Sequence, residues 1–198
     1  MKKNLLGNSD LELSEIGFGT WAIGGGDWGM GWGDQYEPES VACILEGLGS
    51  GINWIDTAHA YGFGVAEIAV GKAIKEYGSS DVIVATKCGV LPEQDNKPIR
   101  FISRKTILEE VDGSLRRLGR DYIDLYQIHW PNPPENLSEA WETLQELKKA
   151  GKIRWAGLCN CWEDELKTLQ GIAPITSNQP MYSMLDRSIE KEVLPWCE

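Results

Sequence analysis

A carboxylate and a phenol lie close together in the stretch GINWIDTAHAYGFG, residues 51–64. A short apolar run ends at Asp56, and Tyr61 follows five residues later among glycines. Two further apolar runs also end at titratable side chains, VIVATK at Lys87 and IDLYQIH at His129. Gathered at one place, these groups could transfer a proton to or from a carbonyl oxygen.

The phenol is the group whose proton would move. A free tyrosine has a pKa of about 10 and is a poor proton donor near neutral pH. A neighbouring ammonium such as Lys87 favours the phenolate, and a buried Asp56 would keep that ammonium charged and in place. The imidazole of His129 could orient a carbonyl oxygen or share the proton. We therefore predict that the pKa of Tyr61 lies below its ordinary value.

Apolar runs alternate with helical patterns along the chain, which predicts βαβ units and a parallel sheet. Ser103 and Ser138 are candidate helix N-caps. The runs expected as strands span 16–20, 52–56, 82–86, 122–128, 153–158 and 175–179. The segments expected as helices span 37–51, 64–78, 103–119, 136–152, 161–171 and 187–196.

Two architectures compete for such a chain, the (β/α)₈ barrel and the doubly wound open sheet. The early glycines follow a strand but lack the G-x-G-x-x-G spacing of a dinucleotide-binding turn, which favours the barrel. A barrel forms its active site at the carboxyl ends of its strands. The two-residue alternation of strands allows Asp56, Lys87 and His129 all to point inward there.

The length of the chain limits this barrel. Eight βα units take about 250 residues, whereas this chain has 198. We therefore expect an incomplete barrel of about six βα units in one domain, residues 1–198, from a fragment or a truncated paralogue. The two outer strands would have unpaired edges, each a template for self-association.

Composition excludes several classes of protein. A net charge of −11 argues against nucleic acid and anionic membranes as partners. No apolar run approaches the roughly 18 residues of a membrane span, and no signal peptide is recognisable, so we expect a cytoplasmic protein. Five cysteines at irregular spacing indicate reduced thiols. Cys159 and Cys161 lack further soft ligands at zinc-type spacing, so no metal site is expected.

The motifs together resemble the aldo-keto reductase family. The resemblance rests on GINWIDTAHAYGFGVAEIAVGKAI, VIVATKCG, YIDLYQIHWP and SNQPMYSMLDR, which occur in order along nearly the whole chain. The segment GFGTWAIGGGDWGMGWGD resembles bacterial members. The resemblance implies a (β/α)₈ barrel that reduces aldehydes and ketones with NADPH, without a metal.

The resemblance also implies roles for single residues. Tyr61 would be the acid and base, Asp56 and Lys87 its tuning pair, and His129 the group that orients the substrate. The positions implied to bind the cofactor are Asn160 and Gln179, on the nicotinamide carboxamide, together with Asp56. Cys159 stands where the family commonly has serine, and a thiol is a weaker donor than a hydroxyl.

Other interpretations remain open. Trp21 matches a residue that lines the substrate pocket, and a purely structural aromatic is equally compatible with its position. The chain could be a non-catalytic relative that binds a cofactor or a partner protein. It could also be a metal-dependent barrel hydrolase that uses Asp56, His59 and His129. The sequence names neither the carbonyl substrate nor the choice between NADPH and NADH.

Overall fold

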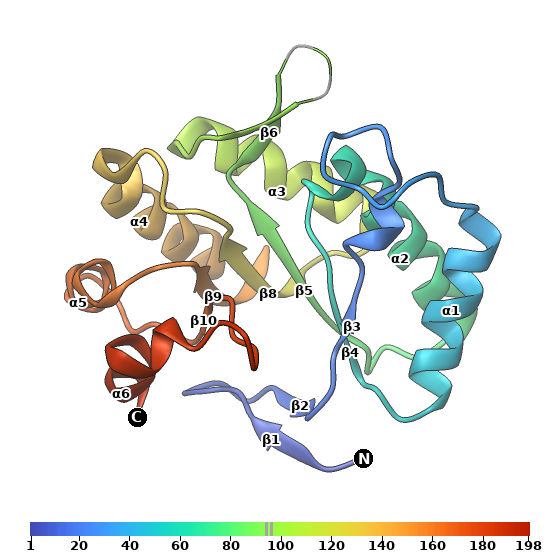
Figure 1. Cartoon of the computed structure of the whole chain (residues 1–198), viewed down its shortest axis with the longest axis horizontal. Coiled ribbons are helices and arrows are strands. Elements are labelled where there is room, and N and C mark those ends of the chain that lie inside the picture. Colours follow the sequence, from blue (N-terminus) through green and yellow to red (C-terminus); the bar gives the residue numbers. More distant parts are fainter. Residues whose placement is uncertain (94, 96) are drawn as a thin grey trace.

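A parallel sheet forms the centre of the fold, with helices in an arc around it (Figure 1). The computed structural model describes residues 1–93, 95 and 97–198, and within them the sheet has six strands in the order β10-β9-β8-β5-β4-β3. All neighbouring pairs are parallel. This arrangement confirms the incomplete (β/α)₈ barrel.

The sheet strands lie inside the expected runs or extend beyond them by at most two residues. Because β3 and β10 each have a single neighbour, the described sheet has two edges. Self-association at these edges stays a prediction. The strands are β3 (Phe18–Gly19), β4 (Trp54–Asp56), β5 (Ile83–Cys88), β8 (Ile123–Ile128), β9 (Ile153–Cys159) and β10 (Asn178–Gln179).

The helices also follow the expected segments. They are α1 (Glu37–Gly49), α2 (Val65–Tyr77), α3 (Arg104–Leu118), α4 (Leu137–Lys149), α5 (Glu163–Gln170) and α6 (Val193–Cys197). Ser103 caps α3 as predicted, because its hydroxyl accepts from the main-chain N–H of Thr106 at 3.2 Å. The prediction for Ser138 is wrong, since α4 begins at Leu137. None of the helices in the described ranges is long and apolar enough to cross a membrane.

Two antiparallel hairpins were not expected from the sequence. The first pairs β1 (Lys3–Leu5) with β2 (Glu12–Ser14), and the second pairs β6 (Val90–Pro92) with β7 (Pro98–Arg100). Their strands have three residues each, too few to show an alternating pattern. The hairpins cover opposite ends of the sheet, and β6 and β7 lie at the end where the candidate site forms (Figure 1).

Side chains alternate between the two faces of the sheet, so the core has two parts. Residues such as Ile55, Val84 and Tyr126 are fully buried between the sheet and the helices. The alternate positions face the barrel interior, where Ala85 and Leu125 pack with Leu11 from the turn between β1 and β2. This apolar cluster fills the end of the interior opposite the polar strand ends.

Candidate active site

Lys87 joins Asp56 and Tyr61 at the carboxyl edge of the sheet. Its ammonium nitrogen lies 2.8 and 2.9 Å from the two carboxylate oxygens of Asp56 and donates to the Tyr61 hydroxyl at 3.2 Å. A further bond of 3.0 Å goes to the carbonyl oxygen of Thr57. The Lys87 side chain is 3% exposed, so these acceptors replace the water that a charged amine otherwise binds.

The strand register explains how the ammonium reaches Asp56. In the parallel pairing of β4 with β5, Asp56 lies beside Ala85, two residues before Lys87. Residues two apart on a strand point to the same face, so Ala85 and Lys87 both face the interior. Lys87 thus begins one layer nearer the mouth of the barrel, and its long stem extends back to the carboxylate.

Tyr61 begins the turn Tyr61–Gly64 between β4 and α2. Gly62 and Gly64 in this turn have φ values of 66° and 107°, which side chains on L-residues disfavour. A Cβ at Gly62 would also collide with the carbonyl oxygen of Gly24 in the glycine-rich segment before α1. Glycine is therefore needed for the Tyr61 turn to pack closely against that segment.

A buried ion pair lies behind this turn. Glu67 on α2 is fully buried, and its carboxylate accepts from Arg117 on α3 at 2.7 Å and from Thr86 on β5 at 2.6 Å. The Arg117 guanidinium also lies 3.1 Å from Nδ1 of His59. These bonds connect the segment before Tyr61 to two helices and one sheet strand.

The arrangement of His59 does not suit the hydrolase alternative. Its imidazole faces Arg117, whereas Asp56 binds Lys87. Burial lowers the pKa of His59, and the positive charge of Arg117 lowers it further. In residues 1–93, 95 and 97–198, no group of three or more His, Cys, Asp or Glu side chains is placed to hold a metal ion.

The pKa of Tyr61 differs from the sequence prediction. Burial raises it above its ordinary value, and Lys87 opposes this rise without cancelling it. The prediction of a lowered pKa is therefore wrong, because the cost of placing a phenolate in a desolvated site exceeds the attraction of one ammonium. Burial alone would lower the pKa of Lys87, but Asp56 reverses the effect and holds it above its ordinary value.

His129 lies against Tyr61 at the end of β8. Their ring centroids are 5.8 Å apart with the planes at 79°. Burial lowers the pKa of His129 to about 3, and the charges of Lys87 and Arg100 add to the effect. The imidazole is therefore neutral near pH 7. Its buried Nδ1 has no hydrogen-bond partner among the described residues.

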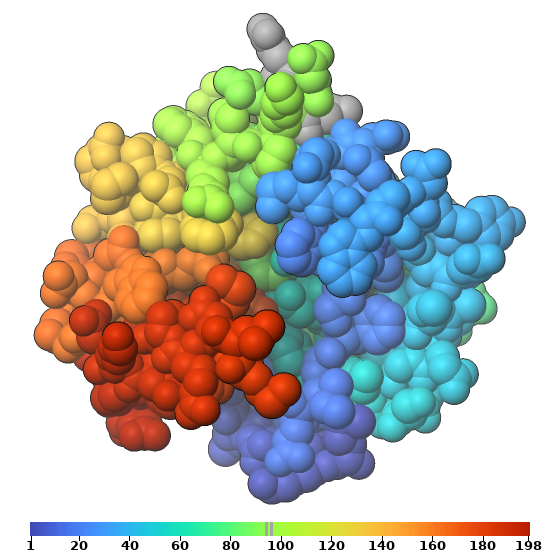
Figure 2. Space-filling view, viewed as in Figure 1, coloured from blue at the N-terminus to red at the C-terminus, as the bar shows by residue number. Residues whose placement is uncertain are grey.

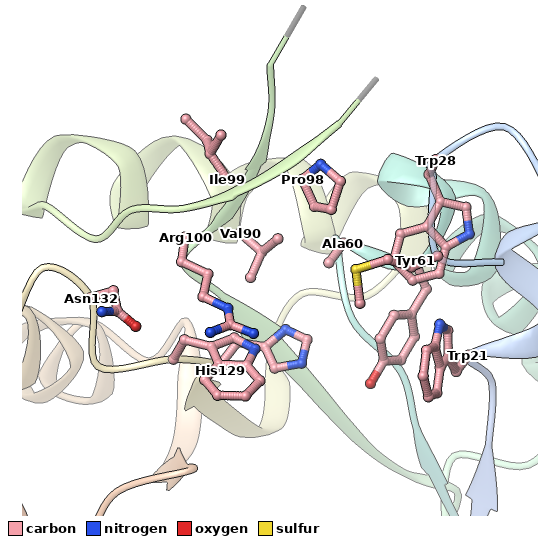
Figure 3. Close-up of a pocket in the computed structure, with 12 residues that line it drawn as sticks. Trp21, Trp28, Ala60, Tyr61, Val90, Pro98, Ile99, Arg100, His129 and Asn132 are labelled. Carbon is pink, nitrogen blue, oxygen red and sulfur yellow. The ribbon is translucent and has the colours of Figure 1, made fainter. Parts of the chain in front are cut away.

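A pocket of about 610 Å³ opens beside Tyr61 and His129. The space-filling view shows a hollow at the centre of this face, between the blue glycine-rich segment and the red C-terminal segment (Figure 2). In the close-up, Tyr61 and Trp21 lie on one side of the pocket and His129 and Arg100 on the other (Figure 3). The lining residues are Trp21, Trp28, Met30, Ala60, Tyr61, Val90, Pro98, Ile99, Arg100, His129, Trp130 and Asn132.

The fold and this strand-end arrangement agree with a comparison against known families. The family model described as "Aldo/keto reductase family" matches residues 15–198. The chain belongs to the aldo-keto reductase family.

This chain is similar to two curated bacterial proteins. It is 45% identical over 199 residues to "Aldo-keto reductase YhdN" of Bacillus subtilis (strain 168). It is 42% identical over 209 residues to the "NADH-specific methylglyoxal reductase" of Escherichia coli (strain K12). Each match covers 100% of this chain, which spans 59% of the first relative and 64% of the second.

Solved structures of the family superpose well on this chain. The glycerol dehydrogenase AKR11B4 from Gluconobacter oxydans has a TM-score of 0.88 and 38% identity, over 98% of this chain and 59% of that one. An aldo-keto reductase from Klebsiella pneumoniae in complex with NADPH has a TM-score of 0.77 and 29% identity, over 100% of this chain and 64% of that one.

Amide side chains gather at the ends of β8, β9 and β10. Nε2 of Gln127 donates to Oε1 of Gln179 at 3.3 Å and to the sulfur of Cys159 at 3.2 Å, while Nδ2 of Asn160 donates to the carbonyl oxygen of His129 at 2.9 Å. Burial raises the pKa of Cys159 to about 12, so its thiol stays protonated and can donate. Amides both donate and accept, so this cluster fits a carboxamide ligand.

The site also includes Trp28, Arg100 and Gln127, which are not among the catalytic, cofactor-binding or substrate-binding residues predicted from the sequence. Trp28 is buried in the glycine-rich segment, and its ring lies 6.0 Å from that of Tyr61. Arg100 lies on the hairpin β6–β7, which the sequence did not predict, and no periodic pattern indicates that this side chain reaches the pocket. Gln127 could have been found, because it shares the interior parity of Leu125 and His129.

Proposed function

We propose that the protein is a carbonyl reductase that converts aldehydes and ketones to alcohols, with Tyr61 as the proton donor. The observation that supports it most is the 3.2 Å bond between the Tyr61 hydroxyl and Lys87, which is itself held by Asp56. The bond lies beside a pocket large enough for a small carbonyl compound. Membership of the aldo-keto reductase family supports the same chemistry.

Tyr61 supplies the proton in this proposal. Its raised pKa keeps the phenol protonated at neutral pH, so it is ready to donate. The neutral imidazole of His129 donates a hydrogen bond to the substrate oxygen and orients it. As the proton leaves, the negative charge that forms on the Tyr61 oxygen is stabilised by the adjacent ammonium of Lys87. The reverse reaction takes the proton back from the alcohol.

The hydride for the carbonyl carbon comes from a reduced nicotinamide dinucleotide when that cofactor is bound. We propose that Asn160 and Gln179 hold its carboxamide and that Asp56 borders it. In the described part of the chain, Oδ1 of Asn160 and Nε2 of Gln179 have no side-chain partner and can serve this ligand. The resemblance favours NADPH, while one relative is named as specific for NADH.

The position of Trp21 supports a role for this residue in binding the substrate. It lines the pocket, the residue is 44% exposed, and its ring packs edge-on against that of Trp28 with centroids 6.4 Å apart. An aromatic side chain that was purely structural would bury more of its surface. We therefore propose that the Trp21 ring contacts the substrate.

Cofactor oxidation across a panel of carbonyl compounds tests the proposed function. The protein, expressed from its complete reading frame, is mixed with NADPH or NADH and with aliphatic and aromatic aldehydes and ketones. We expect oxidation of at least one cofactor with several aldehydes. Tryptophan fluorescence measures cofactor binding in the same samples. Binding without any turnover would contradict the reductase and favour the non-catalytic alternative.

A further inference from the structure

The pocket wall opposite Tyr61 carries a cation that the proton transfer does not use. Arg100 ends β7, and its guanidinium extends into the pocket beside His129 (Figure 3). The other described lining residues are aromatic, apolar or neutral polar side chains, with no carboxylate among them. A full positive charge therefore stands in a pocket whose walls otherwise suit an apolar substrate.

Arg100 differs from most of the other arginines in its pairing. The chain has 30 acidic and 19 basic residues, so acidic partners are plentiful. No side-chain hydrogen bond or ion pair involves Arg100 within residues 1–93, 95 and 97–198. The arginines that do pair with a carboxylate are Arg104, Arg117, Arg120, Arg154 and Arg187.

An aromatic ring holds the guanidinium in place. The central carbon Cζ of Arg100 lies 3.4 Å from the ring centroid of Trp130, which follows His129 directly. Stacking engages the flat face of the guanidinium and leaves the N–H donors at its edge available. Such an edge matches the two oxygens of a carboxylate.

We propose that Arg100 is an anion-binding subsite, which selects carbonyl substrates that also carry a carboxylate. The proposal rests on the proposed reduction. A substrate would place its carbonyl oxygen between Tyr61 and His129 and its carboxylate against the guanidinium. The positive charge of Arg100 already acts within this pocket, because it contributes to the lowered pKa of His129.

Matched substrates with and without the charge test this subsite. The probes are para-formylbenzoate and its methyl ester, which share the aromatic aldehyde and differ in the anion. We expect the wild-type protein to reduce the acid with a kcat/KM about tenfold or more above that of the ester. Because the anion lies away from the reacting carbon, the difference should appear mainly in KM.

The variant Arg100→Met should remove this preference. We expect KM for the acid to rise about ten- to a hundredfold, while the ester changes by less than about threefold. Arg100→Lys keeps the positive charge but lacks the paired N–H donors of a guanidinium, so it should recover part of the preference for the acid. Arg104→Met is the matched control, because Arg104 pairs with Glu146 and does not line the pocket. This control variant should prefer the acid over the ester as strongly as the wild type does.

Failure of the subsite is distinct from failure of the reductase. Equal kcat/KM for acid and ester, or an unchanged ratio in Arg100→Met, would overturn the subsite and leave the reductase in place. If neither aldehyde were reduced, the proposed function would fail, and calorimetric binding of benzoate would decide the subsite. Binding at least tenfold weaker in Arg100→Met supports the subsite, and equal or absent binding in both proteins overturns it.

Discussion

Replacing Lys87 with methionine removes the charge next to the proton donor and keeps most of the side-chain volume. The Lys87 nitrogen lies 3.2 Å from the Tyr61 oxygen, so at an effective dielectric of about 20 it stabilises a phenolate by about 5 kcal/mol. Each 1.36 kcal/mol changes a rate by about tenfold. The rate of reduction should therefore fall about a hundredfold if half the charge has formed in the transition state, and several thousandfold if all of it has.

The assay is kcat/KM for aldehyde reduction, with circular dichroism as a check on the fold. Removing one partner of a buried ion pair costs about 3–5 kcal/mol of stability, because Asp56 keeps its charge without a counter-ion. The double variant Lys87→Met/Asp56→Asn removes both charges and should regain stability without regaining rate. If Lys87→Met reduced the rate by less than about threefold in a folded protein, phenolate stabilisation by Lys87 would be refuted.

Two further predictions follow from buried titratable groups. His129 has a pKa of about 3, so kcat/KM for reduction should be flat between about pH 5 and 8, and an acid-side transition near its ordinary value would contradict a neutral imidazole. Burial raises the pKa of Glu110 to about 8, so the folded state holds a proton that the unfolded chain has released. The contribution of Glu110 to stability should therefore be greatest below about pH 4.5 and fall by about 1.4 kcal/mol per pH unit up to about pH 8. Glu110→Gln should remove this slope in urea unfolding, and an equal slope in both proteins would show that Glu110 is not its source.

The order and type of the elements could be predicted from the sequence because their signals are local. The run 82–86 and the pattern of 103–119 each contain the period of their own structure. Strand alternation also predicted that Asp56, Lys87 and His129 could face one interior. Parallel strands end at the same edge of a sheet, so side chains distant in sequence meet there without any further signal.

Features that depend on tertiary packing could not be predicted in this way. Burial raises the pKa of Tyr61, and the rings of Trp28 and His129 that pack against it lie far from it in the sequence. The strands of the hairpin that carries Arg100 are too short to show an alternating pattern, so the sequence does not predict that this arginine lies at the pocket. Asn136, the residue before α4, forms no side-chain cap, and its amide nitrogen donates to the carbonyl oxygen of Ile102, a long-range contact that no local pattern predicts.

The variant Tyr61→Phe tests the central claim most directly, because it removes one oxygen atom and leaves the ring in place. The measurement is single-turnover aldehyde reduction beside the cofactor dissociation constant from tryptophan fluorescence. With Tyr61 as the source of the proton, reduction should slow by at least about a thousandfold while cofactor affinity stays within about threefold. A variant that reduced aldehydes at more than about a tenth of the wild-type rate would show that the proton comes from elsewhere.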